Sequence, residues 1–182
     1  MERIHVARMK SPIGTLAVAS SSRGAAAIEM DGDGARFRGH LARWWRGAEL
    51  RDDAGPNRAL LAQLEAYFAG ERKRFTVAID LRGTEFQRAV WEEMRRIPYG
   101  EVRSYGEVAC AVGRPRGPRA IGTACHGNPL PLIVPCHRVI AGDGTLGGFG
   151  GRLDLKTALL EIEGIPATSW GRARPRAMAS RP

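Results

Sequence analysis

The stretch from Ile133 to Ile140 constrains this chain more than any other part of its sequence. It places Cys136 and His137 between two pairs of apolar residues, and Pro135 fixes the backbone ahead of the cysteine. β-Branched apolar residues favour a buried strand, whereas a thiol beside an imidazole is chemically reactive. We therefore expect an extended, buried segment that holds a nucleophile rigidly inside a pocket.

The charge of the chain predicts a polyanionic partner. The formal net charge is +9, and 25 of the 28 basic residues are arginine. Binding to a polyanion releases counterions for every phosphate that is neutralised, so nucleic acid is the first candidate. A genome rich in G and C would also encode many arginines, so the charge alone leaves both interpretations open.

Length and cysteine content narrow the class of protein. A chain of 182 residues can form one ordinary domain or two small ones. No apolar run approaches the roughly 20 residues that span a bilayer, and the first residues do not resemble a signal peptide, so we expect a cytoplasmic protein that binds no membrane. Three cysteines without CxxC spacing indicate neither a disulfide framework nor a zinc site. We predict no metal and no cofactor.

The first half of the chain predicts a small α/β domain at residues 1–82. Residues 3–30 alternate apolar runs with turn residues, which is typical of an antiparallel meander whose first hairpin turns at 11–14. Apolar spacing predicts helices over 35–49 and 57–70, and a further strand over 75–80. No set of residues in this half suggests chemistry, so we expect a supporting role.

The second half predicts a mostly helical domain at residues 83–166. Thr84 and Gln87 form one capping-box pattern, and Ser104 and Glu107 form a second. Two short helices, the second over about 117–127, are joined by a turn that contains Gly113, which is the helix-turn-helix pattern. A last helix is expected over 153–163. The tail, residues 167–182, has four arginines and no acid, and we expect it to be disordered.

The second helix of this pair carries small residues where a major-groove reader carries long polar ones. Ala120, Gly122 and Thr123 would let the helix backbone approach closely, which suits a minor groove. The same residues could instead pack one helix on another, and the helix alone does not decide between these interpretations. Arginines gather nearby and predict a surface that faces phosphates: Arg103, Arg114, Arg116 and Arg119.

The chemistry centres on Cys136. A cysteine attacks as its thiolate, and His137 is the obvious base. Adjacent residues of an extended backbone point to opposite sides, so direct contact between the sulfur and the imidazole requires that the chain turns there, and we predict that a water bridges them. Glu163, on the last helix, is the candidate carboxylate that orients the imidazole.

Several motifs together resemble the O6-alkylguanine-DNA alkyltransferase family, whose members are methylated-DNA:protein-cysteine methyltransferases. The central motif is Pro135-Cys136-His137-Arg138-Val139, with Gly127-Asn128-Pro129 before it and a glycine-rich run at 147–151 after it. The resemblance covers about residues 3–165. Its other motifs are Ser11-Pro12-Ile13-Gly14, Ala66-Tyr67-Phe68, Ile97-Pro98-Tyr99-Gly100-Glu101-Val102, Ser104-Tyr105, Arg119-Ala120-Ile121-Gly122 and Leu159-Leu160-Glu161-Ile162-Glu163-Gly164.

The resemblance implies an α/β + α fold of two domains. The N-terminal domain would be ribonuclease-H-like with an antiparallel sheet, and the C-terminal domain would be winged-helix-like with a helix-turn-helix. The implied function is direct reversal of DNA damage. The alkyl group of O6-alkylguanine, and of O4-alkylthymine, would pass irreversibly to the protein's own cysteine, and the partner would be double-stranded DNA contacted through the minor groove by a monomer.

Individual roles follow from the resemblance. Arg119 would replace a guanine that is flipped out of the duplex, and Tyr105 would help to turn the nucleotide and donate a proton to the departing base. The main-chain carbonyls of Cys136 and Val139 would receive the guanine amino group. Asn128 would brace the turn beneath the nucleophile. Phe149 and Gly150 would contact the substrate, the amide of Gly150 facing the O6 atom.

The sequence alone leaves three other functions open: a cysteine hydrolase, a lesion-binding protein without activity, and a transcription factor. Only the hydrolase would turn over, and known lesion binders of this type lack the cysteine that this chain keeps. We expect Cys125 and Cys110 to serve packing alone, the latter on an apolar helix face. The sequence leaves open the range of alkyl groups, cooperativity on DNA, any regulatory role and the purpose of the tail.

Overall fold

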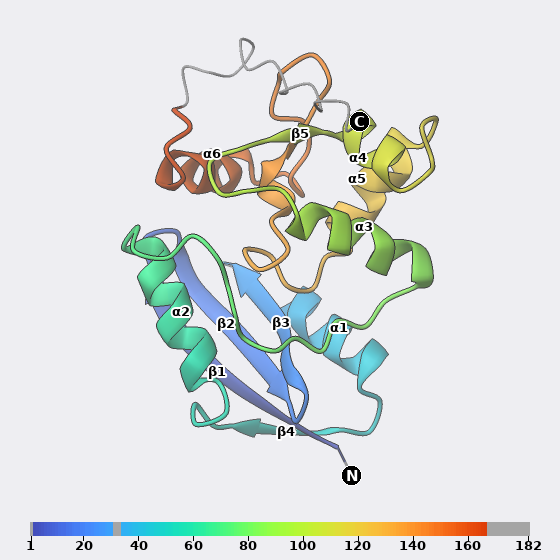
Figure 1. Cartoon of the computed structure of the whole chain (residues 1–182). Coiled ribbons are helices and arrows are strands. Elements are labelled where there is room, and N and C mark those ends of the chain that lie inside the picture. Colours follow the sequence, from blue (N-terminus) through green and yellow to red (C-terminus); the bar gives the residue numbers. More distant parts are fainter. Residues whose placement is uncertain (1, 31–33, 167–182) are drawn as a thin grey trace. The chain divides into compact units, whose positions relative to one another are not determined.

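The computed structural model describes residues 2–30 and 34–166, so the predicted basic tail at 167–182 lies outside the described residues (Figure 1). The chain divides into two compact units. The first unit contains residues 1–88 together with 128–133, and the second contains residues 89–127 together with those from 134 onwards. In the described ranges no helix is long and apolar enough to cross a bilayer.

A four-stranded sheet forms the centre of the first unit. The predicted meander is present as β1 (Arg3–Ser11), β2 (Gly14–Ser21) and β3 (Gly24–Met30), and the hairpin turns at Ser11, whose hydroxyl donates to the carbonyl of Gly14. A fourth strand, β4 (Glu49–Asp52), pairs parallel with β1 and gives the order β3-β2-β1-β4. The sheet is therefore mixed, whereas the sequence predicted an antiparallel one.

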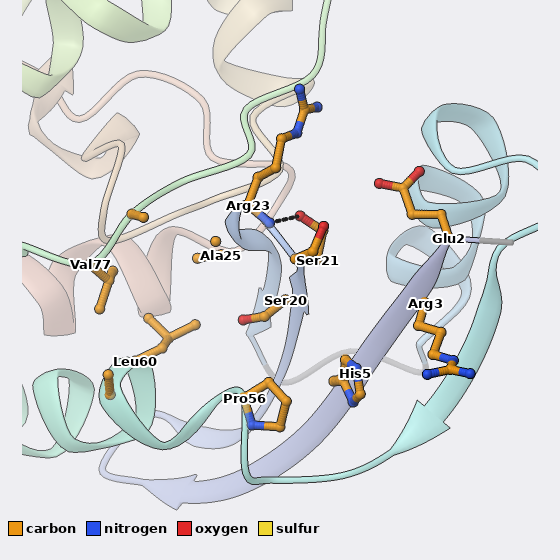
Figure 2. Close-up of a pocket in the computed structure, with 14 residues that line it drawn as sticks. Glu2, Arg3, His5, Ser20, Ser21, Arg23, Ala25, Pro56, Leu60 and Val77 are labelled. Carbon is orange, nitrogen blue, oxygen red and sulfur yellow. Dashed lines mark hydrogen bonds between the residues drawn. The ribbon is translucent and has the colours of Figure 1, made fainter.

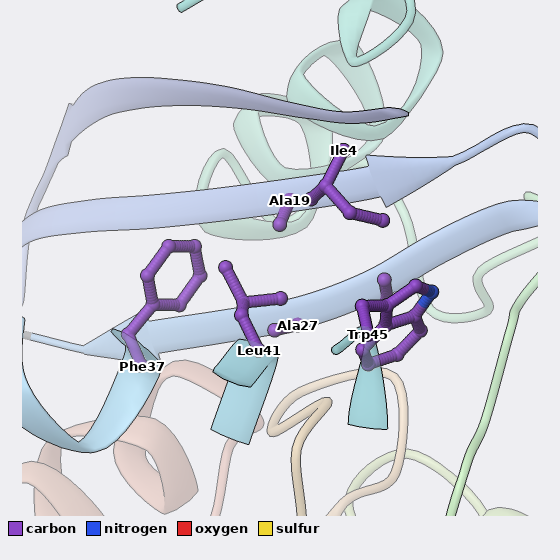
Figure 3. Close-up of a cluster of buried hydrophobic side chains, with 7 residues drawn as sticks. Ile4, Ala19, Ala27, Phe37, Leu41 and Trp45 are labelled. Atoms are coloured by element: carbon purple, nitrogen blue, oxygen red, sulfur yellow. The ribbon is translucent and has the colours of Figure 1, made fainter. Parts of the chain in front are cut away.

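Helix α1 (Ala35–Trp44) packs on this sheet through a small apolar core (Figure 3). Phe37, Leu41 and Trp45 meet Ile4 and the alanines of β2 and β3, which are small enough to let the helix approach the strands. The second helix, α2 (Arg58–Phe68), buries Leu60, Leu64 and Tyr67. Both helices fall within the predicted ranges, because their apolar residues recur with helical spacing.

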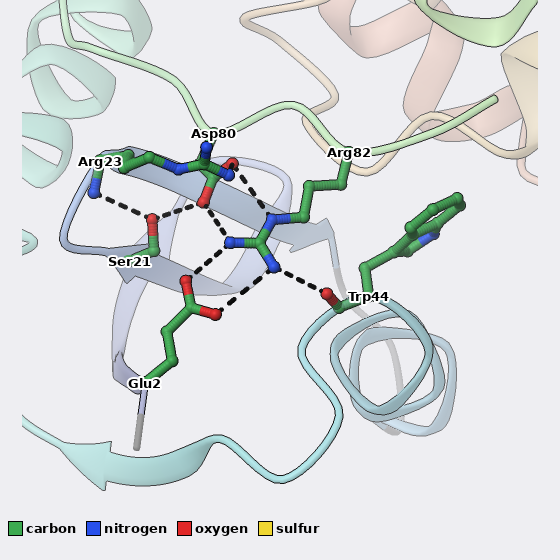
Figure 4. A network of polar contacts seen from close by, with 6 residues as sticks. All are labelled: Glu2, Ser21, Arg23, Trp44, Asp80 and Arg82. Carbon is green, nitrogen blue, oxygen red and sulfur yellow. Dashed lines mark hydrogen bonds and ion pairs between the residues drawn. The ribbon is translucent and has the colours of Figure 1, made fainter. Parts of the chain in front are cut away.

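The strand predicted over 75–80 is wrong. The structure gives only one isolated bridge there, between Ala25 and Ile79. The amide of Thr76 donates to the side chain of Gln63 at 2.8 Å, so its hydrogen bond goes to a helix instead of a neighbouring strand. A polar network fixes the end of the segment, where Arg82 donates to Asp80, Glu2 and the carbonyl of Trp44 (Figure 4).

Gly24 is where the segment 75–80 comes closest to the sheet. Its φ is 136°, and a Cβ added there would lie 2.3 Å from the carbonyl oxygen of Ala78. We expect Gly24→Ala to lower the free energy of unfolding by about 2–4 kcal/mol. Gly39 on α1 has nothing within 4 Å of an added Cβ, so Gly39→Ala is the matched control and should stabilise by up to about 1 kcal/mol. Urea unfolding measures both, and equal stabilities would contradict this reading of Gly24.

Helices dominate the second half of the chain, as predicted. They are α3 (Glu85–Arg95), α4 (Tyr105–Ala111), α5 (Pro118–His126) and α6 (Leu153–Ile162). Both capping boxes are present: Thr84 and Gln87 exchange side-chain to main-chain bonds, and so do Ser104 and Glu107. Helices α4 and α5 form the predicted helical pair, and two residues of β5 (Arg103–Ser104) pair parallel with β6 (Val139–Ile140).

Candidate active site

The nucleophile stretch turns where the sequence predicted an extended strand. Cys136–Arg138 is a short 3-10 helix, in which the amide of Arg138 donates to the carbonyl of Pro135 at 2.9 Å, and only Val139–Ile140 is strand. Residues 130–140 are all buried, so the apolar pattern predicted burial correctly and backbone shape incorrectly. The turn has a physical reason. It brings the side chains of His137 and Arg138 to one carboxylate, which neighbours on an extended strand could not reach together.

That carboxylate is Glu163, the predicted partner of His137. Nε2 of His137 lies 2.6 Å from Oε1 of Glu163, and both side chains are fully buried. Arg138 donates to both carboxylate oxygens, at 2.8 and 2.9 Å, and also to the carbonyl of Ile97. The amide of Gly100 donates to Oε2 of Glu163 at 3.1 Å. The sequence placed Arg138 in its motif but gave it no role.

Burial and hydrogen bonds fix the protonation states of this cluster. Burial raises the pKa of Glu163, but the hydrogen bonds from His137 and Arg138 outweigh it, so the net shift is downward and the carboxylate is ionised. Burial lowers the pKa of His137 by more than Glu163 raises it. At neutral pH the imidazole is therefore neutral, with its proton on Nε2 toward the carboxylate.

The other imidazole nitrogen is left as an acceptor. Nδ1 of His137 is buried and has no hydrogen-bond partner among the described residues. A neutral imidazole whose Nε2–H is used by a carboxylate can take a proton only at Nδ1. The group beside Cys136 is thus chemically suited to serve as a general base.

Tyr105 is positioned by the glycine-rich loop, which we define as residues 141–151. Its hydroxyl donates to the carbonyl of Gly148 at 3.1 Å. Burial, and to a smaller degree Cys125 and Cys136, raises the pKa of Tyr105 to about 12, so at neutral pH it is a phenol that can donate a proton. A Cβ on Gly147 would lie 2.8 Å from the ring, so glycine is needed for this close approach.

Lys156 on α6 is a buried residue that sequence reasoning missed. Its ammonium donates to the carbonyls of Val139 and Leu146, each at 2.5 Å. A signal for it was present in the sequence, because the lysine lies within the apolar stripe formed by Leu155, Leu159 and Leu160. A lysine on the buried face of a helix is uncommon without a specific partner.

The residues predicted to contact DNA lie on or beside the helical pair. Arg119 and Thr123 are exposed on α5, whereas Ala120 and Gly122 are half-buried. Arg103 is half-buried in β5, where it donates to Glu101 at 3.3 Å. Ala120 and Gly122 are small, so α5 carries no long side chain at these two positions. The binding role of these residues stays a prediction.

Other predicted site residues divide between the two units. Val139 is buried in β6, while Phe149 is half-buried and Gly150 exposed in the glycine-rich loop. Asn128 belongs to the first unit, where its side-chain oxygen accepts from the amide of Leu130 at 3.0 Å. The predicted bracing role of Asn128 and the predicted substrate contacts stay predictions.

The two remaining cysteines differ. Cys125 packs as predicted: its Sγ lies 3.4 Å from Sδ of Met94, and burial raises the pKa of its thiol. The prediction for Cys110 is wrong, because its side chain is exposed. Helix α4 buries its neighbours Val108 and Ala109, and the next position along the helix faces away from the apolar face.

The first unit has a cavity of its own, of about 710 Å³ (Figure 2). Its lining includes His5, Ser20 and Ser21, but both hydroxyls are occupied, that of Ser20 by Asn57 and that of Ser21 by Asp80. The Asp80 carboxylate that accepts from Ser21 is also paired with Arg23 and Arg82, so it is a weak base. Across the described ranges there is also no group of three or more histidine, cysteine or acidic side chains that could hold a metal ion.

Comparison with known proteins matches both halves of the chain to one family. The ribonuclease-like domain of 6-O-methylguanine DNA methyltransferase matches residues 4–81, and the DNA binding domain of the same family matches residues 85–165. The chain belongs to the 6-O-methylguanine DNA methyltransferase family. The family also confirms the predicted fold of a ribonuclease-like α/β domain followed by a mostly helical DNA-binding domain.

Relatives and solved structures support the assignment over most of the chain. A methylated-DNA--protein-cysteine methyltransferase of Mycobacterium leprae is 43% identical over 160 residues, which are 88% of this chain and 92% of the relative. The crystal structure of Mycobacterium tuberculosis OGT in complex with DNA superposes with a TM-score of 0.77 at 41% identity, covering 92% of this chain and 98% of that one. An O6-methylguanine-DNA methyltransferase from Pyrococcus kodakaraensis has a TM-score of 0.60 at 26% identity, over 88% and 99% of the two chains.

Proposed function

We propose that this protein repairs DNA by transferring the alkyl group of O6-alkylguanine, and of O4-alkylthymine, to Cys136. The observation that carries the proposal is the buried pair of His137 and Glu163, with His137 directly after the buried Cys136 in the sequence, within a chain of this family. The relatives are named for the same transfer, from methylated DNA to a protein cysteine. The protein is thus a methyltransferase that is consumed by its own reaction.

The cluster supplies the first half of the chemistry. The proton of the Cys136 thiol passes, through a water, to Nδ1 of His137, the nitrogen without a partner among the described side chains. The imidazolium that forms is stabilised by Glu163, which is already ionised. Arg138 holds the carboxylate through two hydrogen bonds, so the imidazole keeps its orientation.

The second half is a displacement at the alkyl carbon. A bond forms between the sulfur and that carbon while the bond from the carbon to O6 breaks, and the electron pair stays with guanine. Guanine leaves more easily if it is protonated as it departs, and the phenol of Tyr105 is the donor that we assign. The product is a thioether, which has no polarised carbonyl for water to attack, so the protein cannot turn over.

The geometry supports an approach to DNA by the helical pair. A base inside a duplex is out of reach of a buried thiol, so the nucleotide must be flipped out. Helix α5 presents Arg119 next to the small residues Ala120 and Gly122, a combination suited to a minor groove. In this proposal Arg119 fills the place of the flipped base, while Thr123 and Arg103 contact the backbone.

The finer assignments are part of the same proposal. The carbonyls of Cys136 and Val139 receive the guanine amino group, the amide of Gly150 and the ring of Phe149 contact the base, and Asn128 braces the turn before the nucleophile. The DNA-binding domain begins near residue 83, and the protein acts as a cytoplasmic monomer. Neither a metal nor a cofactor takes part in any step that we propose.

Counting repaired lesions distinguishes this function from hydrolysis. With a tenfold excess of a duplex that contains one O6-methylguanine, repair should stop after one equivalent per protein, measured by chromatography of the digested DNA. The repaired duplexes should contain normal guanine in place of the lesion, and the remaining duplexes should still contain O6-methylguanine. Continued turnover would favour a cysteine hydrolase, and lesion binding without any repair would favour a binding protein.

A further inference from the structure

Lys156 is a buried charge that the alkyl-transfer steps above do not use. Its side chain is fully buried on α6, and its ammonium donates at 2.5 Å to the carbonyls of Val139 and Leu146. The ring centroids of Tyr105 and Phe149 lie 5.9 and 5.8 Å from Nζ. Two carbonyls and two aromatic rings therefore lie close to one cation.

Burying the charge of Lys156 costs free energy that burial of an apolar side chain would not cost. An ammonium taken out of water loses several kcal/mol of hydration free energy, and a carboxylate partner normally offsets part of this loss. None of the contacts that the described residues make with Lys156 is a carboxylate. Burial accordingly lowers the pKa of Lys156 to about 8, against the raising effect of Cys136 and Cys125. An apolar side chain would fill the same space without this loss.

The two carbonyls belong to the segments that frame the nucleophile. Val139 follows Cys136–Arg138 directly in β6, and Leu146 lies in the glycine-rich loop. Two residues further along, Gly148 accepts the hydrogen bond of the Tyr105 hydroxyl. The loop is thus fixed at two neighbouring points, one by the ammonium and one by the phenol that the reaction needs.

We propose that Lys156 is a positioning residue for alkyl transfer, which ties the glycine-rich loop at Leu146 to β6 at Val139 and thereby sets the hydroxyl of Tyr105. The inference rests on the proposed function, since it names how one donor in that reaction is held. Lys156 touches neither the reacting sulfur nor the leaving base in this account. It acts through Tyr105.

A double-mutant cycle between Lys156 and Tyr105 tests the coupling. Lys156→Met keeps the packing volume and removes the three donors, and at saturating duplex it should slow methyl transfer about 10- to 100-fold with little change in DNA affinity. Tyr105→Phe removes the donor. If Lys156 acts through Tyr105, Lys156→Met should slow transfer less than about threefold in the Tyr105→Phe background. The neighbouring Thr157→Ala is the matched control and should stay within about twofold of the unsubstituted protein.

Two results would overturn the inference. One is a transfer rate of Lys156→Met within about twofold of the unsubstituted protein. The other is an equal slowing by Lys156→Met with and without the Tyr105 hydroxyl, which would mean that the cation acts on the thiolate instead. Transfer by none of the proteins, including the unsubstituted one, would overturn the proposed function.

Hydrogen exchange tests whether Lys156 holds the glycine-rich loop in place, without using the transfer reaction. Lys156→Met should speed amide exchange in residues 141–151 about tenfold or more and leave α2 unchanged. If the variant does not fold, the Cys136→Ala protein compared between pH 6 and pH 9 replaces it, because the pKa of Lys156 is about 8 with Cys136 present and lower without it. Of the titratable groups that interact with Lys156, Tyr105 and Cys125 have raised pKa values, His137 has a lowered pKa, and Cys136 is absent from that variant. If amide exchange in residues 141–151, corrected for intrinsic rates, did not change when Lys156 is replaced or loses its charge, the proposed role of Lys156 in holding the loop would be contradicted.

Discussion

Replacing Cys136 with alanine should abolish methyl transfer and leave DNA binding within about threefold of the original affinity. The thiol is the only atom that the proposed reaction bonds to the alkyl carbon, so its removal is not compensated by the remaining binding interactions. Alanine lacks only the buried sulfur atom of Cys136, so the free energy of unfolding should fall by only about 1 kcal/mol. Transfer of label from methylated duplex to protein measures the reaction, and fluorescence anisotropy measures binding.

The other two cysteines provide matched controls. Cys110 is exposed on α4 and Cys125 packs against Met94, so neither Cys110→Ala nor Cys125→Ala should slow transfer more than about twofold. If Cys136→Ala still removed the methyl group, or if Cys125→Ala alone abolished the reaction, the assignment of the nucleophile would be wrong.

Replacing Glu163 with glutamine should slow transfer about 100-fold and also destabilise the fold by about 3–5 kcal/mol. The carboxylate is the only anion among the contacts that the described residues give to His137 and Arg138 in this cluster. Its loss leaves the guanidinium of Arg138 buried without a counter-charge, and it removes the charge that stabilises the imidazolium. Single-turnover kinetics and urea unfolding measure the two effects separately.

Glu161 is the matched control for this substitution. It is exposed one residue before Ile162 on the same helix, so Glu161→Gln should change neither the rate by more than about twofold nor the stability by more than about 0.5 kcal/mol. A rate for Glu163→Gln that equals the unsubstituted one would remove Glu163 from the mechanism, however unstable the variant is.

The stability of the Glu163 cluster should depend on pH in one direction. The pKa of the folded carboxyl lies below its ordinary value of 4.5, so its contribution is complete above that value and is lost as the pH falls toward the folded pKa. The lowered pKa of His137 acts in the same direction, since the unfolded chain takes up a proton below its ordinary pKa of 6.5 before the folded chain does. Both groups make acid conditions unfavourable to this fold.

Local signals predicted most of the helices. Apolar residues at helical spacing gave α1, α2 and α6, and the capping boxes at Thr84 and Ser104 placed the starts of α3 and α4. These signals work because each depends on residues only three or four positions apart. The link between His137 and Glu163 spans 26 residues, and the sequence offered Glu163 on the last helix only as a candidate for it.

The predictions that were wrong or missing concern residues whose interaction partners are distant in sequence. Thr76 lies in a segment with strand composition, but Gln63 of α2 takes its amide hydrogen bond. Strand β4 has no apolar alternation, because it pairs at the edge of the sheet with β1. The turn at Cys136 is set by a carboxylate that accepts from two consecutive side chains, and Lys156 gains its role from two carbonyls far from it in sequence. Such contacts leave little trace in local composition.

The most direct test of the central claim is the intact mass of the protein after reaction with a duplex that contains one O6-methylguanine. We predict a gain of one methyl group per protein, located on Cys136 by peptide mapping, that does not increase with further substrate. An unchanged mass with tight and selective binding of the lesion would contradict the claim and identify a binding protein. An unchanged mass without binding would contradict it too and favour hydrolase chemistry at the same cysteine.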